Sequence, residues 1–325
     1  MNRRLFMGIA AGAVALGMLA GPAAAQQKLK FAHVYETSEA YHKWALWAAD
    51  EITKRTNGRY SMEVFPASSL GKETDINQGL TLGTVDIIYT GTNFAGRSYG
   101  PIAIAAAPYM FRDFDHWRAY TKSDLFKELA GGYDKATGNK VLAMLYYGER
   151  HVTSKQPVNR PEDMKGMKIR VPDAPMYVMF PRAVGANPTP IAFAEVYLAL
   201  AQGTVDAQEN PLPTILAKKF YEPSPVINLT GHITESLLTI VGAPLWKKLS
   251  DEDKKTFAAV FAEAAAKSDE DIIASEKELV DGFAKMGAKV NKVDRAPFRA
   301  MVTKVHLGDG VPWTKEQYER LQQIR

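Results

Sequence analysis

The chain of 325 residues contains no cysteine. It therefore has no disulfide framework, no thiolate nucleophile, no cysteine-based zinc or iron–sulfur site, and no cysteine at which a bacterial signal is lipidated. Beyond residue 25, no apolar run approaches the ~20 residues that span a bilayer. The 40 basic and 36 acidic residues nearly balance, so bulk charge gives no reason to expect a nucleic-acid partner. With 46% hydrophobic residues the composition is globular, and the length predicts about two domains.

Several motifs of catalysis and cofactor binding are also missing. The sequence has no phosphate-binding P-loop, no G-x-G-x-x-G turn, and no H-E-x-x-H among its 6 histidines. No pair of carboxylates stands out as a general acid and base. We therefore expect no metal and no cofactor, and these absences disfavour an enzyme without excluding one.

The first 25 residues have the layout of a secretory signal peptide. Arg3 and Arg4 precede an apolar stretch over 5–19, which Gly21–Pro22 interrupts before the small residues 23–25. The stretch is shorter than the ~20 residues of a membrane span. The paired arginines also resemble a twin-arginine signal, so the export route, Sec or Tat, stays open. We expect an exported chain that is cleaved near Ala25.

The remaining sequence repeats one order of elements. Alternating and β-rich runs are separated by helical patterns that end at glycine, which gives the order βαβαβ twice. Gly-Thr-Val-Asp opens the third strand of each unit, at 83–86 and again at 203–206. Alternating strands and helices predict a parallel sheet covered by helices, and two such units predict two α/β lobes. The expected strands are 28–34, 60–65 and 85–89 in the first unit, and 168–171, 189–191 and 205–208 in the second.

The last quarter of the chain differs, because an apolar stripe at helical spacing runs from Asp251 to about Gly287. Ser250 and Asp253 form a start that resembles a capping box. The pattern predicts one helix of roughly 30 residues, or two helices broken near Ser268. A helix of that length would brace both lobes.

Three polar side chains follow strands of the second half. Arg170 ends one predicted strand, Arg150 follows the run 141–147, and Asn210 follows 205–208. Ligands of α/β sheets bind beyond the carboxyl ends of strands, so these groups are expected to converge on a crevice. The planar fork of arginine suits a carboxylate. The alternative is that the arginines lie at the surface and pair with nearby acids such as Glu149 and Asp173.

Aromatic residues and one acid are further candidates for the crevice. Phe193, which opens a helix after Pro190, is the best candidate for a cleft wall, and Tyr89 is another. Core packing is the alternative for most aromatics of this set. Glu36, in the loop after the first strand, would disfavour a bare anion but accept a hydrogen bond from an amine or hydroxyl. It is otherwise a solvated loop carboxylate.

These residues lie within longer motifs. The segments GERH (148–151), PEDMKGMKIRVP (161–172), VGANPTPIAFAEVYLALAQGTVDAQENP (184–211) and KKFYE (218–222) closely resemble the solute-binding proteins of TRAP transporters. The resemblance is to the DctP branch, which includes sialic-acid and C4-dicarboxylate binders, and it covers about residues 28–290. It implies a two-lobe periplasmic binding protein fold with a hinge.

The resemblance also implies how the chain divides and where the ligand binds. The first lobe is expected at 26–147 plus about 236–270, and the second at 148–235 plus about 271–325. The family's selectivity arginine falls on Arg170, a second ligand arginine on Arg150, the ligand asparagine on Asn210, and a wall aromatic on Phe193.

Some positions depart from the sialic-acid pattern. Asp173 stands where those binders carry asparagine, and the chain reads Thr90-Gly91-Thr92 where they carry an acid after the third strand. The loop Val34-Tyr35-Glu36 lacks their asparagine. We therefore predict a carboxylate ligand and leave the rest of the ligand open. The candidate ligand-binding residues are Arg170, Arg150, Asn210, Phe193, Asp173, Glu36 and Tyr89.

The predicted function is that of a non-catalytic periplasmic subunit that captures a small organic acid and delivers it to TRAP membrane subunits. The short tail after Gly308 favours a monomer. One alternative is a sensor that presents its closed form to a receptor kinase. The other is a periplasmic enzyme acting on an organic acid, which the missing nucleophile–base pair disfavours.

Overall fold

The computed structural model describes residues 26–325, so the predicted signal peptide lies outside the described residues. The described strands form a single mixed sheet in the order β2-β1-β3-β8-β4-β7-β5-β6, with β9 beside β8. Within the described part of the chain, no helix has the length and apolar character of a membrane span. The strands are β1 Gln27–Ala32, β2 Tyr60–Phe65, β3 Ile87–Gly91, β4 Lys140–Ser154, β5 Lys168–Val171, β6 Asn187–Pro190, β7 Ala207–Pro211, β8 Val226–Val241 and β9 Lys289–Asn291.

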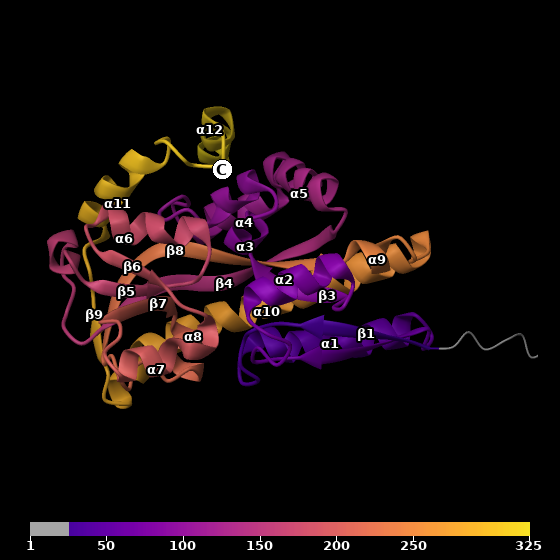
Figure 1. Ribbon diagram of the computed structural model, residues 1–325, viewed down its shortest axis with the longest axis horizontal. Helices are drawn as coiled ribbons and strands as arrows, with labels where there is room; N and C mark the ends of the chain where they lie inside the picture. Colours follow the sequence, from indigo (N-terminus) through magenta and orange to yellow (C-terminus); the bar gives the residue numbers. More distant parts are fainter. Residues whose placement is uncertain (1–25) are drawn as a thin grey trace, which may run out of the picture.

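Helices cover both faces of this sheet (Figure 1). The α-helices are α1 Ala40–Arg55, α2 Glu73–Leu82, α3 Thr92–Ala95, α4 Phe114–Lys122, α5 Asp124–Thr137, α6 Met179–Ala183, α7 Val196–Ala201, α8 Leu212–Ala217, α9 Ala243–Trp246, α10 Asp251–Lys285, α11 Arg295–Val302 and α12 Lys315–Gln323. Short 3₁₀ turns occupy Gly100–Ala106, Pro161–Met164, Pro175–Val178, Phe193–Glu195 and Thr303–Val305.

The predicted repeat is present. In the first half β1 lies between β2 and β3, and in the second half β5 lies between β6 and β7. All four of these pairings are parallel. The two βαβαβ units therefore have the same strand order, and each places its third strand toward the middle of the sheet. The predicted α/β class is confirmed.

The Gly-Thr-Val-Asp sequence has the same role in both units. Gly83 and Gly203 follow the helices before the third strand and adopt φ of +76° and +72°, the left-handed conformation that glycine adopts without strain. Asp86 and Asp206 then accept hydrogen bonds from the backbone N–H of Lys30 in β1 and Lys168 in β5, at 2.8 and 2.9 Å. The tetrapeptide thus ends a helix and fixes the register of the strand that follows.

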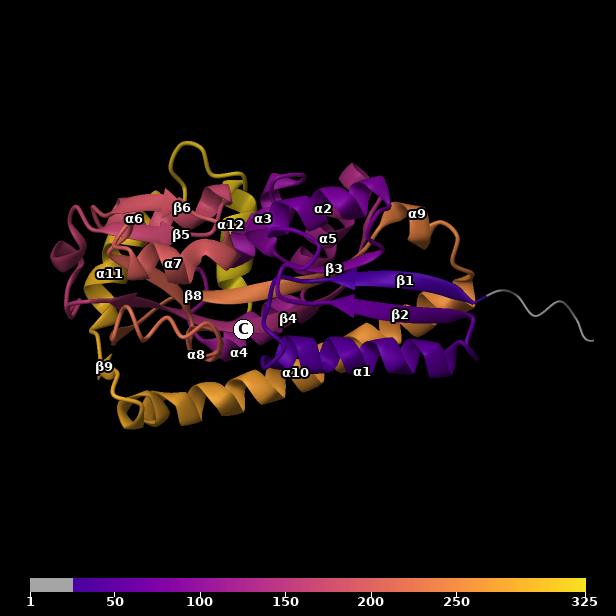
Figure 2. The ribbon, with the colours of Figure 1, turned by 60° about the horizontal axis from the view of Figure 1, so that its bottom comes forward.

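The two halves are joined by their longest strands. β4 pairs antiparallel with both β8 and β7, and β8 pairs antiparallel with β3. Both strands run through the middle of the molecule from one half to the other (Figure 2). The register of β4 shifts between Tyr146 and Gly148 and again between Arg150 and Val152, so β4 is irregular where it passes between the halves.

α10 is one continuous helix of 35 residues, so the alternative of two helices broken near Ser268 is wrong. Ser250 caps it, because its hydroxyl accepts a hydrogen bond from the N–H of Asp253 at 3.1 Å. The helix runs along the length of the molecule beside α1 (Figure 2). Phe257 and Phe261 pack into the core of the first half, and Phe283 packs into the core of the second. The predicted bracing helix is therefore present.

The C-terminal segment differs from the predicted division. Trp313 and Leu321 pack into the core of the first half. Arg112 donates hydrogen bonds to the carbonyls of Gln322 and Ile324. α11, in contrast, contributes Phe298 to a core of the second half. The chain therefore returns to the first half after α11, instead of ending in the second.

Candidate functional site

A cavity lies between the two halves. The first half contributes the end of β1 and the start of α2, and the second contributes the ends of β5 and β7 with the turns that follow them. The lining residues are Val34, Tyr35, Lys72, Glu73, Thr74, Phe94, Tyr147, Arg150, Arg170, Pro172, Asp173, Tyr177, Ala192, Phe193, Asn210 and Leu237. This is the crevice that the strand ends predict for an α/β sheet.

Arg170 stands at the carboxyl end of β5 and is 1% exposed. Its Nε and Nη2 donate to the carbonyl of Ile191 at 2.9 and 2.7 Å. Its Nη1 is buried and has no hydrogen-bond acceptor within residues 26–325. Burial lowers the pKa of the guanidinium to about 10, so the group stays charged at neutral pH. A buried charged donor without an acceptor is costly, and a ligand carboxylate in this cavity would satisfy it.

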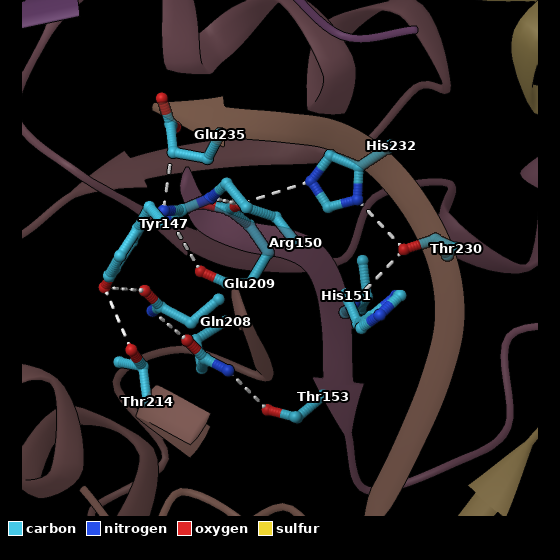
Figure 3. A network of polar contacts seen from close by, with 12 residues as sticks. Tyr147, Arg150, His151, Thr153, Gln208, Glu209, Thr214, Thr230, His232 and Glu235 are labelled. Atoms are coloured by element: carbon cyan, nitrogen blue, oxygen red, sulfur yellow. Dashed lines mark hydrogen bonds and ion pairs between the residues drawn. The ribbon is translucent and has the colours of Figure 1, made fainter. Parts of the chain in front are cut away.

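Arg150 also lines the cavity, but it does not stand at a strand end as predicted. β4 continues to Ser154, because its two neighbours β7 and β8 pair with it on both sides. The Nη2 of Arg150 lies 2.7 Å from the carboxylate of Glu209, and Nη1 lies 3.7 Å from that of Glu235 (Figure 3). Burial alone would raise the pKa of Glu209, but Arg150 lowers it to about 2. Glu209 thus compensates the charge of Arg150.

Asn210 and Phe193 take the predicted places in the cavity wall. The Nδ2 of Asn210 donates to Gln208 at 2.6 Å, and its Oδ1 lies 3.2 Å from the hydroxyl of Tyr147. The centroid of the Phe193 ring is 5.9 Å from the guanidinium carbon of Arg170 and 5.2 Å from the Nζ of Lys218. The ring of Phe193 thus forms part of the cavity wall next to Arg170.

Asp173 lies at the rim of the cavity, where its carboxylate is 3.1 Å from the guanidinium of Arg97. Arg97 belongs to the first half and Asp173 to the second, so this ion pair crosses the mouth of the cavity. Asp173 therefore pairs with Arg97, and not with Arg150 or Arg170 as the alternative from the sequence has it. Asp173 is half-exposed, and it faces solvent as well as the cavity.

Glu36 and Tyr89 do not line the cavity. Glu36 instead forms an ion pair of 2.7 Å with Lys218 of the second half. Tyr89 is 1% exposed and packs edge-on against Phe31 in the core of the first half, with 4.7 Å between ring centroids. All residues of β3 are buried, and Tyr89 belongs to the core of the first half together with its neighbours Ile87 and Ile88. The sequence predicts that Glu36 and Tyr89 contact the ligand, but neither side chain lies at the cavity.

The sequence reasoning missed Glu73 and Tyr177. Glu73 begins α2, and its Oε1 accepts hydrogen bonds from the hydroxyl of Thr90 at 2.9 Å and the N–H of Gly91 at 2.8 Å. Desolvation raises the pKa of its carboxyl to about 7. An acid therefore does approach the end of β3, but from the neighbouring helix and not from the strand itself. In the sequence Glu73 is recognisable as the start of a helix, and a helix start by itself does not indicate a ligand-binding site.

Residues 96–100 read Gly-Arg-Ser-Tyr-Gly, which has the G-x-S-x-G form of a serine nucleophile elbow. In hydrolases that turn connects a strand to a helix and exposes the serine above the sheet. Here Ser98 follows helix α3 on an exposed turn, and none of the described histidines forms a hydrogen bond with it. The motif thus lacks the structural context that its chemistry requires.

Two α/β units, joined by long strands, enclose a cavity with a buried and partly unsatisfied guanidinium. This arrangement defines a two-lobe binding protein for an anionic solute. The family model described as DctP, bacterial extracellular solute-binding protein, family 7, matches residues 31–308. The chain belongs to this family, the solute-binding proteins of TRAP transporters, and the predicted resemblance is confirmed.

Relatives and solved structures support this assignment. The chain is 36% identical over 251 residues to the sialic acid-binding periplasmic protein SiaP of Vibrio cholerae, covering 77% of this chain and 78% of that one. It is 32% identical to the 2,3-diketo-L-gulonate-binding periplasmic protein YiaO of Escherichia coli, covering 84% of each. A TRAP periplasmic solute-binding protein of Polaromonas, solved with D-erythronate, superposes with a TM-score of 0.88 at 32% identity, covering 92% of this chain and 99% of that one.

Proposed function

We propose that the protein captures a small organic acid by its carboxylate and delivers it to TRAP membrane subunits. The observation that carries this proposal is the Nη1 of Arg170, which is buried and without an acceptor in the described chain. A ligand carboxylate beside Phe193 would accept from that donor, and a hydrogen bond to a charged group contributes about 1.5–3 kcal/mol. Asn210 would add one uncharged donor.

The charges of the cavity favour a ligand with one carboxylate. Glu209 compensates Arg150, and Arg97 pairs with Asp173. Arg170 thus provides the unmatched positive charge of the buried part of the cavity. Glu73 on the opposite half would repel a second carboxylate. C4-dicarboxylates are therefore poorer candidates than monocarboxylates.

The opposite wall favours hydroxyl groups on the rest of the ligand. The Oε1 of Glu73 is occupied by Thr90 and Gly91, which leaves Oε2 to accept from a ligand hydroxyl. Tyr35, Tyr147 and Tyr177 present further polar groups around the cavity. The related proteins described above bear names or ligands of sugar-acid type. We therefore propose a polyhydroxy monocarboxylate, such as an aldonate or uronate.

The cellular role follows from the family. We propose that residues 1–25 are a signal peptide, that the mature chain is a periplasmic monomer, and that it performs no catalysis. The cavity offers groups that bind an acid, and its two arginines are held by the protein rather than positioned as a base or nucleophile. Recovery of the bound acid chemically unchanged after incubation with the protein would support binding without catalysis.

The direct test is thermal unfolding of residues 26–325 with a panel of acids. The panel contains D-erythronate, L-galactonate and D-glucuronate as polyhydroxy monocarboxylates, with sialic acid and succinate for comparison. A ligand at about 1,000 times its dissociation constant adds about 4 kcal/mol to the free energy of unfolding. We expect the polyhydroxy monocarboxylates to raise the unfolding midpoint and succinate to leave it unchanged.

Variants of two arginines complete this test. Arg170→Gln removes the proposed carboxylate donor and should abolish the shift, whereas Arg182→Gln changes an exposed arginine and should preserve it. A shift that survives Arg170→Gln would contradict the proposed site. A response to succinate alone would contradict the proposed ligand class while leaving the site intact.

A further inference from the structure

A chain of hydrogen bonds leads from the first half of the protein to the ligand side of Asn210. The hydroxyl of Thr214, in α8, lies 2.6 Å from the Oε1 of Glu39 and 3.2 Å from the hydroxyl of Tyr147. The Tyr147 hydroxyl in turn lies 3.2 Å from the Oδ1 of Asn210. Tyr147 and Thr214 face one another in Figure 3. Asn210 and Tyr147 line the cavity, whereas Glu39 and Thr214 lie behind it.

The orientation of the Asn210 amide is fixed from the other side. Its Nδ2 donates to the Oε1 of Gln208 at 2.6 Å, and the Nε2 of Gln208 donates to Thr153 at 3.0 Å. The carbonyl of Asn210 therefore faces Tyr147 and has to accept there. An amide nitrogen carries two protons, so one N–H of Asn210 remains for the cavity.

The number of protons in this chain is decisive. Three contacts link Glu39, Thr214, Tyr147 and Asn210, and each contact needs one proton. The two hydroxyls supply one proton each. The third has to come from the carboxyl of Glu39. When Glu39 is protonated, every group donates to the next one, and the chain ends on the Asn210 carbonyl.

An ionised Glu39 leaves the chain one proton short. Thr214 then donates to the carboxylate, because a charged acceptor forms the stronger hydrogen bond. Tyr147 can donate either to Thr214 or to Asn210, but not to both. One pair of oxygens therefore faces each other without a proton, and the carbonyl of Asn210 loses its fixed donor for part of the time.

We propose that Glu39 is a positioning residue for ligand binding, and that its protonated carboxyl holds the Thr214–Tyr147–Asn210 chain in the arrangement that aims the free N–H of Asn210 at the ligand. This inference rests on the proposed function, because it requires Asn210 to contact the bound acid. Glu39 belongs to the first half and Thr214 to the second. The contact therefore forms when the halves are together around the cavity and links ligand binding to that closure.

The surroundings of Glu39 permit this role. Its second oxygen accepts from the backbone N–H of Glu36 at 2.7 Å, and the neighbouring cation, Lys218, pairs with Glu36 instead. From α1, the hydroxyl of Tyr41 donates to the backbone carbonyl of Tyr147. No cation therefore pairs with the Glu39 carboxylate among the described residues.

The acids of α10 on this side are engaged by other partners. Glu276 accepts from the hydroxyl of Tyr146 at 2.8 Å, and Asp271 pairs with Lys43 at 2.7 Å. Glu39 is 4% exposed, and burial raises its pKa to about 7. The carboxyl thus gains its proton as the pH falls through neutrality, and the chain is complete on the acidic side.

The experiment compares wild type with Glu39→Gln. The glutamine amide can donate to Thr214 while its carbonyl accepts from the N–H of Glu36, which reproduces the protonated acid without titrating. Dissociation constants are measured by calorimetry from pH 5.5 to 8.5 with the acid of the panel that raises the unfolding midpoint furthest. We expect equal affinities at pH 5.5 and wild type about tenfold weaker at pH 8.5, the effect of one net hydrogen bond. The titration of Glu73 affects wild type and Glu39→Gln alike, so it cancels in the ratio of their dissociation constants.

Three further variants separate this role from a structural one. Thr214→Val interrupts the chain, so adding Glu39→Gln to this variant should no longer change the pH dependence of the dissociation constant. Thr214→Ser keeps the hydroxyl. Adding Glu39→Gln to Thr214→Ser should therefore change the pH dependence of the dissociation constant as it does in wild type. Asp124→Asn changes an exposed carboxyl outside the chain, which pairs with Lys127, and should leave the ratio to wild type constant with pH. If the ratio of the dissociation constants of wild type and Glu39→Gln does not change with pH, this inference is overturned while the proposed function stands. If no acid binds either protein, the proposed function fails, and this inference fails with it.

Discussion

The guanidinium of Arg150 is held 2.7 Å from the carboxylate of Glu209, and both side chains are almost fully buried. β4 contributes the arginine and β7 the acid, and these strands are hydrogen-bonded neighbours. Glu209 also accepts from His232 at 3.1 Å (Figure 3). The pair compensates one arginine of the cavity and leaves the other, Arg170, as the unmatched charge. Arg150 is compensated by a carboxylate and Arg170 is not, and this difference makes Arg170 the proposed donor to the ligand carboxylate.

Breaking this pair should destabilise the protein strongly. Glu209→Gln keeps the size of the side chain but removes the hydrogen-bonded partner of Arg150 and leaves it only the more distant Glu235, 3.7 Å away. Removal of one partner from a buried ion pair costs about 3–5 kcal/mol. We expect a loss of that size in the free energy of unfolding, measured by urea denaturation. Asp124→Asn, which breaks an exposed pair with Lys127, should cost less than about 1 kcal/mol; equal effects would contradict this account.

The repeated Gly-Thr-Val-Asp turn allows a matched comparison. Gly83 and Gly203 both have positive φ, so alanine at either position costs about 1 kcal/mol in backbone strain. A Cβ at Gly203 meets no atom within 4 Å, whereas one at Gly83 would lie 3.1 Å from Pro244. We therefore expect Gly203→Ala to lower the free energy of unfolding by about 1 kcal/mol, and Gly83→Ala by about 2 kcal/mol. Equal losses in urea denaturation would show that the proline yields without cost.

Much of the fold is encoded in local sequence. Strand alternation, helix-ending glycines and the repeated tetrapeptide predict both βαβαβ units, and the apolar stripe predicts α10. The length of β4 is not local information, since Arg150 is kept in the strand by pairing with β7 and β8. The return of Trp313 and Leu321 to the first half is likewise a tertiary contact. Short amphipathic segments do not reveal which core they join.

The site was predictable where a strand end places a residue. Arg170 and Asn210 lie at the carboxyl ends of β5 and β7, Phe193 follows β6, and all three line the cavity. Tyr89 illustrates the limit of this reasoning, because β3 is buried in the core on both faces and a place near its end does not bring the side chain to the cavity. Glu73 reaches the cavity from the start of a helix. The ion pair of Arg150 with Glu209 depends on the alignment of two strands that lie far apart in sequence.

A half-buried acid on α10 should make stability depend on pH. Glu276 accepts hydrogen bonds from the hydroxyl of Tyr146 and the N–H of Glu149, and burial raises its pKa to about 7 from an ordinary value of 4.5. The folded state therefore binds this proton more tightly than the unfolded chain. Its contribution to stability is complete below about pH 4.5 and is lost as the pH rises through about 7.

The comparison with Glu276→Gln isolates this group from the other titrating residues. Relative to this variant, the free energy of unfolding of wild type should fall by about 3 kcal/mol between pH 5 and 8. Urea denaturation at each pH measures the difference. Asp281→Asn, at an exposed position of the same helix, serves as the control and should show no trend. A difference that rises with pH would contradict the raised pKa of Glu276.

The two arginines of the cavity should respond to the same substitution in opposite ways. Arg170 is buried, and one of its donors has no acceptor among residues 26–325. Arg170→Gln therefore removes a desolvated charge, while glutamine can still donate to the carbonyl of Ile191. We expect the ligand-free protein to gain about 1 kcal/mol, as binding sites are often optimised at the expense of stability. Arg150→Gln leaves the carboxylate of Glu209 buried without its cation and should cost about 3–5 kcal/mol.

Urea denaturation of both variants without ligand tests this contrast, and the thermal panel then measures what each retains of ligand binding. A stability loss for Arg170→Gln as large as that for Arg150→Gln would mean that the protein itself satisfies Arg170. The cavity would then have no unmatched donor to offer a carboxylate. A gain in stability together with the loss of the ligand-induced shift would instead show that Arg170 is held in an unfavourable state that only the bound acid relieves.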